Sequence, residues 1–502
     1  MLQFRRLTRP STGIRPKFMR QLYCAVAIPR FTYVANVWYA LVTRPAQGTK
    51  ATRSVGATKR LASIQRIAVT AISSALRSTA TDVMEAHTNL PPVELLMHRV
   101  CHRAAIHLAT LPVSHPLHKP VHICARRCAK QHLSPIHLLL CAYNVKPSKY
   151  ETLSMAVRPP NSKCAVVTGI TASREESKEA DLADNATLQV YTDGSGQDGM
   201  ACAAVVLFKG GNIIGILCYH LGPLKQHTTF EAELVSILLG LWLVGRELDA
   251  DSASLKADSQ AAIQALHTHK PGPGGYLLDE IHKLSTSLCE RSLSSLQLKI
   301  SWISGHDGVT GNDRVDEEAK AAATGDSSPW QELPPLLHSD PLPCSSTAAK
   351  QHHRNKLAQD WRHLWAKSPR HQHALKIDPK LPATSFLRLT KDASRAQASI
   401  LFQLRSKHVP LRKYLHRIGK ADSPLCTLCR RGEETVHHFL FDCPAHEHAR
   451  FKLGHKLGRL SKSLWYILGS RKAFKLLIRY VNETGRFHNN PEPPQHAHTV
   501  AC

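Results

Sequence analysis

The spacing of apolar residues changes character along the chain. Up to about Tyr143 they recur at three- and four-residue intervals, most clearly in Lys59–Leu76 and Val93–Leu108, on either side of Leu90–Pro92. This period predicts amphipathic helices. From Leu188 onward, short apolar runs are separated by Gly-rich turns, a pattern that predicts strands. We therefore expect a helical N-terminal region followed by a domain built on a sheet.

The central region predicts three successive strands and then alternating helices and strands. The expected strands are Leu188–Thr192, Ala201–Phe208, Asn212–His220, Ser254–Ala257 and Leu296–Ile303, and the expected helices are Thr229–Arg246, Ser259–His267 and Asp313–Ala323. Such an order is typical of a mixed sheet with helices packed on it. The expected fold class is therefore α/β: a mixed five-stranded sheet with flanking helices, plus mainly helical N- and C-terminal regions.

Length and composition divide the chain further. A chain of 502 residues is too long for one hydrophobic core. Pro159–Glu179 is polar and Pro329–Ser346 is rich in Pro and Ser, which is typical of linkers. The segments that we expect are 1–145, helical; 146–186, linker; 187–325, sheet domain; 326–347, linker; 348–420, basic and helical; 421–450, cysteine-containing loop; and 451–502, basic helix with a disordered tail.

The net charge of the chain points to a polyanionic partner. The formal charge is +27 and the isoelectric point is near 9.7, which favours binding to nucleic acid and its phosphate backbone. Between Leu188 and Ala323 there are 10 Lys and Arg against 16 Asp and Glu, so this region is acidic and the rest of the chain carries +33. An acidic middle between basic arms suggests that the middle cuts and the ends bind. A basic chain that is merely soluble or poorly folded remains the alternative.

Targeting and membrane signals are weak. No apolar run reaches the roughly 18 residues needed to span a bilayer, and Leu234–Gly245 is expected to be a buried helix. The 14 cysteines are mostly scattered, which indicates a reducing compartment. The Arg-rich N-terminus superficially resembles a mitochondrial presequence, but its apolar residues continue into Phe31–Tyr39, so we expect it to be structural.

Four carboxylates stand at the ends of predicted elements. Asp193 and Asp258 follow predicted strands, whereas Glu233 and Asp316 are expected in the first turns of helices. Carboxylates that gather in a folded protein repel one another unless a cation lies between them. Hard divalent cations such as Mg²⁺ prefer oxygen ligands, and two of them, roughly 4 Å apart, can hold a phosphodiester for hydrolysis. The pattern therefore predicts a metal-dependent nuclease.

The same motifs resemble a known family. Order, spacing and predicted elements closely resemble type 1 ribonuclease H over 187–325, and the motifs that carry the resemblance are Tyr191–Ser195, Phe230–Leu234, Ala257–Gln260, Ser304–His306 and Gly311–Asp316. The resemblance implies an endonuclease that hydrolyses the RNA strand of RNA–DNA hybrids. It also implies two Mg²⁺ ions, with Mn²⁺ as an alternative, held by Asp193, Glu233, Asp258 and Asp316.

The resemblance suggests roles for four further residues. His306, in the loop after the last strand, would assist proton transfer or product release. Gly194 would allow close approach to the RNA 2′-hydroxyl, and Ser195 would reach a phosphate. Glu231 lies two residues before Glu233 on the same helix, so only one of them can face the metals. The Ala-Glu-Leu context favours Glu233, and Glu231 is expected to be a solvated acid at the helix start.

Some ribonucleases H carry a basic helical extension that grips the hybrid. Here Gln260–Leu296 offers only Lys270, Lys283 and Arg291, interleaved with acidic residues, Pro and Gly. We therefore expect the basic flanks to supply the affinity for the substrate.

The flanks resemble a second, more loosely defined family. Their order resembles the C-terminal part of a non-LTR (LINE-type) retrotransposon polyprotein, on the segments Tyr33–Tyr39, Ile64–Arg66, Leu90–Pro92, Leu111–Leu117, Gln403–Arg405, Tyr414–Arg417 and Cys426–Cys443. No Asp-Asp pair occurs in the chain, so the reverse transcriptase palm is expected to be missing. The resemblance implies a nuclear location and leaves room for a polymerase partner in trans.

The loop near the C-terminus has the ligand types of a zinc site. Cys426, Cys429, His438 and Cys443 follow the spacing C-x2-C-x8-H-x4-C, which suits a structural Zn²⁺ in a CCHC zinc knuckle. His437 is a competing ligand, and unpaired buried thiols are the alternative. A weaker group is formed by His122, Cys124, Cys128 and His132.

The sequence thus favours a ribonuclease H enzyme with Mg²⁺ and Zn²⁺ as cofactors. The alternative is a catalytically inactive nucleic-acid-binding remnant that uses the basic helices and the zinc knuckle. A third possibility is a fragment whose N-terminal helices expose apolar surface because their packing partner is absent.

Overall fold

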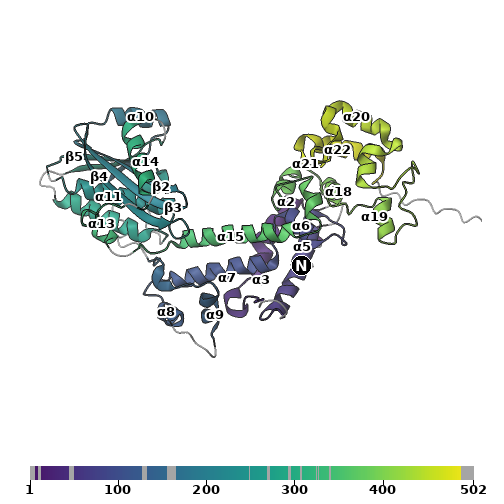
Figure 1. Ribbon diagram of the computed structural model, residues 1–502, viewed down its shortest axis with the longest axis horizontal. Coiled ribbons are helices and arrows are strands. Elements are labelled where there is room, and N and C mark those ends of the chain that lie inside the picture. The colour runs from purple at the N-terminus through teal and green to yellow at the C-terminus, as the bar shows by residue number, and fades with distance from the viewer. Residues whose placement is uncertain are drawn as a thin grey trace, which may run out of the picture. The chain divides into compact units, whose positions relative to one another are not determined.

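The chain folds into two compact units. The computed structural model describes residues 6–8, 13–44, 50–126, 133–154, 166–247, 249–267, 272–291, 296–305, 308–323, 325, 327–338 and 341–487 (Figure 1). Unit 1 comprises Met1–Ala35, Leu41–His98 and Leu357–Cys502, and unit 2 comprises Asn36–Ala40 and Arg99–Lys356. Each unit therefore combines segments that lie far apart in the sequence.

Unit 2 is built on a mixed sheet. Its strands are β1 Val167–Gly169, β2 Leu188–Gln197, β3 Met200–Lys209, β4 Asn212–Pro223, β5 Ser252–Ala257 and β6 Gln297–Trp302, in the order β1-β6-β5-β2-β3-β4. β2, β3 and β4 are antiparallel neighbours, whereas β2, β5, β6 and β1 are parallel. The predicted α/β class with a mixed sheet and flanking helices is confirmed. One detail differs, because β1 makes the sheet six-stranded rather than five-stranded.

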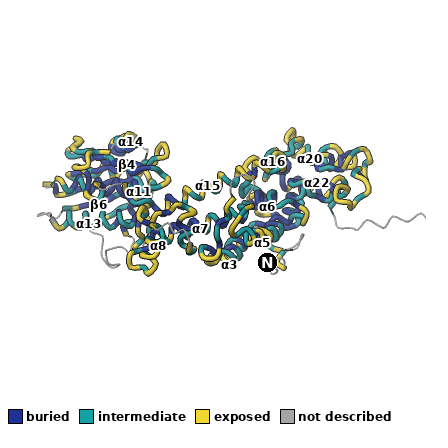
Figure 2. Tube along the Cα trace, turned by 60° about the horizontal axis from the view of Figure 1, so that its bottom comes forward, coloured by how far each residue is buried: buried dark blue, intermediate teal, exposed yellow. Residues whose placement is uncertain are grey.

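The two faces of the sheet are covered by different helices. The helices of this domain are α10 Arg174–Leu182, α11 Thr229–Val244, α12 Gln260–Ala265, α13 Gly275–Arg291 and α14 Thr310–Ala322. Successive residues of a strand point to opposite faces. Val190 and Val205 accordingly pack in the core with α11, while Tyr191 packs in a separate cluster with Val315 of α14. The buried segments, dark blue in Figure 2, include α11 and the strands beneath it.

Two stretches that resemble linkers in composition are part of the fold. The expected linker 146–186 contains β1 and α10, and the expected linker 326–347 contributes Leu333, Leu337 and Leu342 to the sheet core. Trp242 Nε1 of α11 also donates a hydrogen bond to the backbone oxygen of Glu332 at 2.7 Å. Isolated leucines among prolines have no helical or strand period, so the pattern of the sequence did not reveal their burial.

The N- and C-terminal regions are mainly helical, as predicted. The principal helices outside the sheet domain are α2 Pro16–Leu22, η1 Tyr23–Ala27, α3 Ile28–Phe31, α4 Ala35–Trp38, α5 Val55–Ser73, α6 Thr81–Thr88, α7 Val93–Ala109, α8 His118–Arg126, α9 Pro135–Ala142, α15 Ser346–Ala366, α16 His371–Leu375, α17 Ser385–Leu389, α18 Arg395–Ser406, α19 Arg412–Arg417, η5 His438–Asp442, α20 Glu447–Leu457, α21 Leu464–Gly469 and α22 Arg471–Thr484. In the core of unit 1, buried Arg405 donates to Asp378 Oδ2 at 2.6 Å.

Within the described part of the chain, no helix combines the length and apolar character needed to cross a bilayer.

A buried ammonium group ties α10 to the sheet. Lys256 of β5 is 3% exposed, and its Nζ forms ion pairs with Asp181 and, at 2.9 Å, with Asp184 Oδ2. It also donates to Tyr191 OH at 3.3 Å. Burial alone would raise the pKa of Asp184, but hydrogen bonds from Ser254 and Lys256 hold that pKa below its usual value. Lys256 is therefore a charged anchor for α10, alongside the hydrogen bonds of the Ser177 hydroxyl with Trp302 and Ser304.

We predict that Lys256→Ala lowers the free energy of unfolding of unit 2 by about 3–5 kcal/mol, because two partly buried carboxylates lose their counter-charge. The measurement is urea denaturation followed by circular dichroism at neutral pH. Lys283→Ala is the matched control, because Lys283 is 60% exposed in its pair with Glu280; its effect should stay below about 0.5 kcal/mol. Equal effects of the two substitutions would contradict the role of Lys256.

Candidate functional site

Three of the predicted carboxylates converge at one end of the sheet. Asp193, Glu233 and Asp258 each offer an oxygen, and these atoms all lie within 4.8 Å of one another. Asp193 lies in β2, Asp258 directly follows β5, and Glu233 lies in the second turn of α11 rather than in the expected first turn. The structure thus assembles a carboxylate site from three elements that are distant in sequence.

Strand pairing brings the two aspartates together. β2 and β5 are parallel neighbours, with Thr192 opposite Ala257, so the residues that follow both positions emerge at the same edge. Beyond Thr192, β2 continues to Gln197 and pairs only with β3, which is why it extends past the predicted end at Thr192. The carboxyl ends of adjacent parallel strands are where polar sites gather in open sheets.

Close packing of Gly194 brings Glu233 to the same place. A Cβ atom on Gly194 would lie 2.7 Å from Cα of Glu233, far closer than any real side chain allows. Only glycine lets α11 approach β2 at this point. Gly194 was predicted as a substrate contact, and the structure gives it a packing role next to the carboxylates. Ser195, the other predicted contact, is half-buried in β2 opposite Cys202.

The electrostatics of the carboxylate cluster favour a bound cation. Burial, together with the negative charges of Asp258 and Asp193, raises the pKa of Glu233 to about 10. Glu233 Oε2 is buried and has no hydrogen-bond partner among the described residues. An oxygen left without a partner beside two other carboxylates fits a divalent cation, which would supply the missing interaction and displace the proton. The donor set is therefore suited to Mg²⁺ or Mn²⁺.

Asp316 lies apart from this group of three and next to a lysine. It is in the second turn of α14, because the helix begins at Thr310 rather than at the predicted Asp313. Lys320 Nζ forms an ion pair with Asp316 Oδ2 one turn later. This hydrogen bond raises the pKa of Lys320, and the charge of Asp193 adds to the effect. Lys320 was missed from the sequence, although its i+4 spacing from Asp316 was a signal.

Glu231 is not the solvated acid that we expected. It is fully buried and forms a capping box with Thr228, whose backbone N–H donates to Glu231 Oε2 at 2.7 Å. Burial raises the pKa of Glu231 to about 7; the hydrogen bond from Thr228 opposes this shift and the charge of Glu151 adds to it. The sequence did not reveal this burial because Glu231 interacts with residues distant in sequence, Glu151 before the sheet domain and Ser345 after it.

Three predicted candidates lie outside the described residues. His306 is among them, so its expected role in proton transfer stays a prediction. Cys128 and His132 are also outside, and the weaker group of His122, Cys124, Cys128 and His132 is therefore not placed.

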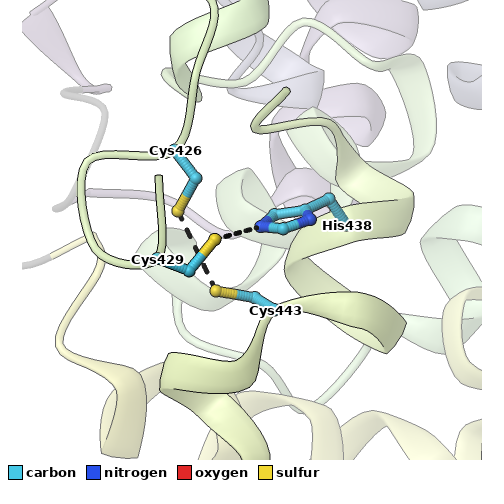
Figure 3. A group of neighbouring side chains, drawn as sticks. All are labelled: Cys426, Cys429, His438 and Cys443. Atoms are coloured by element: carbon cyan, nitrogen blue, oxygen red, sulfur yellow. Dashed lines mark hydrogen bonds between the residues drawn. The ribbon is translucent and has the colours of Figure 1, made fainter. Parts of the chain in front are cut away.

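The four predicted zinc ligands come together in unit 1. Their ligand atoms lie within 4.8 Å of one another, with Cys426 Sγ 3.9 Å from Cys443 Sγ and Cys429 Sγ 3.3 Å from His438 Nε2. Figure 3 shows the four side chains pointing toward one another. Tetrahedral Zn–S bonds of about 2.3 Å place two sulfurs roughly 3.8 Å apart, so the geometry fits Zn²⁺.

His438 rather than His437 belongs to this cluster. The exposed His437 bonds through Nδ1 to Asp442 Oδ2 at 2.7 Å instead. Burial, with the charge of Cys426, raises the pKa of Cys443 to about 12. Without a cation this thiol therefore stays protonated, whereas bound zinc stabilises the thiolate.

The loop is anchored on the surrounding helices. Arg450 of α20 donates to the backbone oxygen of Cys443 at 2.8 Å. Glu434, 1% exposed, accepts from the backbone N–H of Arg412 at 2.7 Å and from the Arg486 guanidinium at 2.6 Å. Metal binding would therefore stabilise the neighbouring helices as well as the loop.

We predict that the purified chain binds about one Zn²⁺ in unit 1 and that Cys429→Ser reduces this to about zero. Elemental analysis of dialysed protein measures the ratio, and thermal unfolding with and without a chelator measures the loss of stability. Cys141→Ser is the control, because Cys141 is an exposed free thiol outside the cluster. Full zinc retention in the Cys429 variant would contradict the site.

Comparison with known proteins places the sheet domain in a family. Residues 185–324 match the family model described as RNase H. No curated protein matches the chain. Similar solved structures include RNase H1 from Halobacterium salinarum NRC-1, with 20% identity over 28% of this chain and 98% of that one and a TM-score of 0.22.

Two further structures match the same part of the chain. The N-terminal RNase H domain of a Mycobacterium tuberculosis protein shares 18% identity over 28% of this chain and 97% of that one, with a TM-score of 0.22. LC11-RNase H1, solved in complex with an RNA/DNA hybrid, shares 18% identity over 27% and 96% of the two chains, with a TM-score of 0.22. On the family match and the observed sheet, residues 185–324 form an RNase H domain.

Proposed function

We propose that the chain is a divalent-metal-dependent endonuclease that hydrolyses the RNA strand of RNA–DNA hybrids. The observation that carries this proposal is the convergence of Asp193, Glu233 and Asp258 within the part of the chain that matches the RNase H family. A decayed copy would have no reason to retain three repelling carboxylates, one of which, Glu233, has a buried oxygen without a hydrogen-bond partner in the described part of the chain. The filled donor set favours an active enzyme over an inactive remnant.

The residues that would hold the metal ions are Asp193, Glu233, Asp258 and Asp316. When bound, two ions of this kind activate a water molecule and stabilise the departing 3′ oxygen, which leaves 5′-phosphate and 3′-hydroxyl ends. Asp316 would have to exchange its ion pair with Lys320 for a metal contact. Lys320 would then be free to face the phosphate of the substrate.

Side chains of the protein would bind and transfer protons, and residues of β2 would face the RNA strand. Burial and its acidic neighbours raise the pKa of Glu233, so this carboxyl would hold a proton before metal binding and release it on becoming a ligand. His306 is the proposed group for proton transfer during turnover. Gly194 and Ser195 lie beside Asp193 on β2, where a 2′-hydroxyl or a phosphate of the RNA would approach.

Substrate affinity is proposed to come from basic surfaces outside the RNase H domain. Helix α22 buries Phe474, Leu477 and Ile478. Lys472, Lys475 and Arg479 are exposed, and among the described residues none of them forms an ion pair. Their i, i+3, i+7 spacing places them on one helix face, where they can follow a phosphate backbone.

The origin and setting of the chain are part of the same proposal. The flanking motifs and the CCHC cluster support derivation from a non-LTR retrotransposon, with a polymerase supplied in trans and a nuclear location. The alternative function is a catalytically inactive nucleic-acid-binding remnant, and the exposed basic face of α22 is the observation that favours it.

The first test is cleavage of a labelled RNA–DNA hybrid in Mg²⁺. The wild-type chain should cut the RNA strand, and Asp193→Asn should lower the rate by at least about 100-fold, because a lost metal ligand removes several kcal/mol of transition-state stabilisation. Asp198→Asn is the control: Asp198 is exposed in the β2–β3 turn at φ 51°, a conformation that asparagine accepts. Tight hybrid binding without cleavage by the wild type would establish the alternative.

A second test concerns the basic face of α22. Replacing Lys472, Lys475 and Arg479 together with Ala should weaken hybrid binding at all sequences and reduce the slope of log Kd against log salt by about 2–3. Fluorescence anisotropy over a range of salt concentrations measures both. Arg471→Ala is the control on the same helix, because Arg471 is already paired with Asp392 at 2.9 Å. An unchanged slope in the triple variant would locate the substrate elsewhere.

A further inference from the structure

A buried carboxylate outside the matched family region reaches into the RNase H domain. Glu151 is 1% exposed. Its Oε2 accepts a hydrogen bond from the backbone N–H of Gly274 at 2.7 Å. Its Oε1 accepts a hydrogen bond from the backbone N–H of Ser346, also at 2.7 Å. Gly274 lies inside 185–324, whereas Glu151 precedes this range and Ser346 follows it.

The segments before and after the domain are paired with each other. Tyr150 and Cys344 form a parallel β-bridge. The backbone N–H of Glu151 donates to the backbone oxygen of Cys344 at 3.1 Å, and the backbone N–H of Cys344 donates to the backbone oxygen of Lys149 at 2.7 Å. Glu151 therefore sits at a junction of three chain segments rather than on a loose arm.

Gly274 connects this junction to the helix that carries Glu233. Gly274 has φ +74°, and a Cβ there would lie 3.1 Å from Leu234 Cδ1 and 3.6 Å from Phe230 Cε1. Both side chains belong to the start of α11 and flank Glu233 in sequence. Gly194 contacts the backbone of Glu233 itself. The beginning of α11 is thus held between Gly194 and Gly274.

Packing alone does not account for a carboxylate at this position. Burying an ionised group is unfavourable unless strong hydrogen bonds replace water, and an apolar side chain would fill the same space without that penalty. What a carboxylate adds is two acceptor oxygens that receive two backbone donors at once, with the strength of charge-assisted hydrogen bonds. Glutamine has a similar shape but only one acceptor oxygen, so its amide would oppose one N–H.

We propose that Glu151 is a positioning residue of the nuclease site, which holds Gly274 and Ser346 in place and so fixes Glu233 against Asp193 and Asp258. The functional nuclease then extends beyond the matched domain and includes the paired segments around Glu151 and Ser346. The inference rests on the proposed function. Glu151 acts through Gly274 and α11 and has no contact with substrate or metal in this scheme.

The test compares Glu151→Gln with Glu175→Gln in the full chain. Glu175 is an exposed acid of α10 and also precedes the matched domain, so its replacement should change nothing. In Glu151→Gln we expect kcat on the hybrid to fall about 10-fold, because a small displacement of a metal ligand is costly. The Mg²⁺ concentration for half-maximal cleavage should rise several-fold while KM for the hybrid stays unchanged.

Binding of Mn²⁺ alone, followed by its electron paramagnetic resonance signal, gives a readout without catalysis. Glu151→Gln should weaken Mn²⁺ binding several-fold, and Asp193→Asn should weaken it at least as much. A second variant, Ser346→Pro, removes one donor to Glu151 while proline is tolerated at the first position of α15. It should shift Mn²⁺ affinity in the same direction.

The outcomes separate this inference from the proposed function. If the wild type neither cuts the hybrid nor binds Mn²⁺, the proposed function falls and this inference falls with it. If the wild type cuts, but both variants lose activity only in proportion to their folded fraction and keep wild-type Mn²⁺ affinity, the positioning role alone is overturned. Weaker Mn²⁺ binding in folded variants of both kinds supports it.

Discussion

Asp193, Glu233 and Asp258 repel one another, and the fold of unit 2 has to hold them together despite this repulsion. Three carboxylate oxygens within 4.8 Å are unfavourable without a cation, so the surrounding fold has to hold them there. β2 and β5 do this through their parallel register, and α11 does it through its contact with Gly194. Burial, together with the charges of Asp258 and Asp193, raises the pKa of Glu233 to about 10, and a bound cation would favour the ionised carboxylate instead.

Contacts inside the RNase H domain and contacts with the segments that flank it both support this arrangement. The apolar helix α11 is buried on the sheet, and its first turn is satisfied by the capping box of Thr228 and Glu231. Ser345, which follows the domain, interacts with the side chain of Glu231, and the backbone N–H of the next residue, Ser346, donates to Glu151. On the other face, α10 is fixed by Lys256. The domain is therefore stabilised in part by Glu151 and α10, which lie outside the range that matches the family.

Local patterns revealed the sheet, the three converging carboxylates and the cluster of three cysteines and one histidine, because each depends on short-range spacing or on strand ends. The same patterns missed β1, Lys320 and the burial of Glu231. β1 has only three residues and no alternation of its own, and its edge position is decided by pairing with β6. Glu231 interacts with a residue more than a hundred positions away, Ser345, and no local window of sequence reveals such a contact.

The separation of charge along the chain follows from the same constraint. In the proposed nuclease, a site made of carboxylates would repel the phosphates of the substrate, and bound metal ions would offset this repulsion only at the site itself. Binding the rest of the substrate therefore requires cations placed elsewhere, and the acidic 188–323 region has few to spare. Exposed side chains such as Lys475 and Arg479 on α22, which form no ion pair with any described residue, would suit that task. The acidic 188–323 region and the basic helices of the C-terminal region would in this sense be complementary parts of the proposed nuclease.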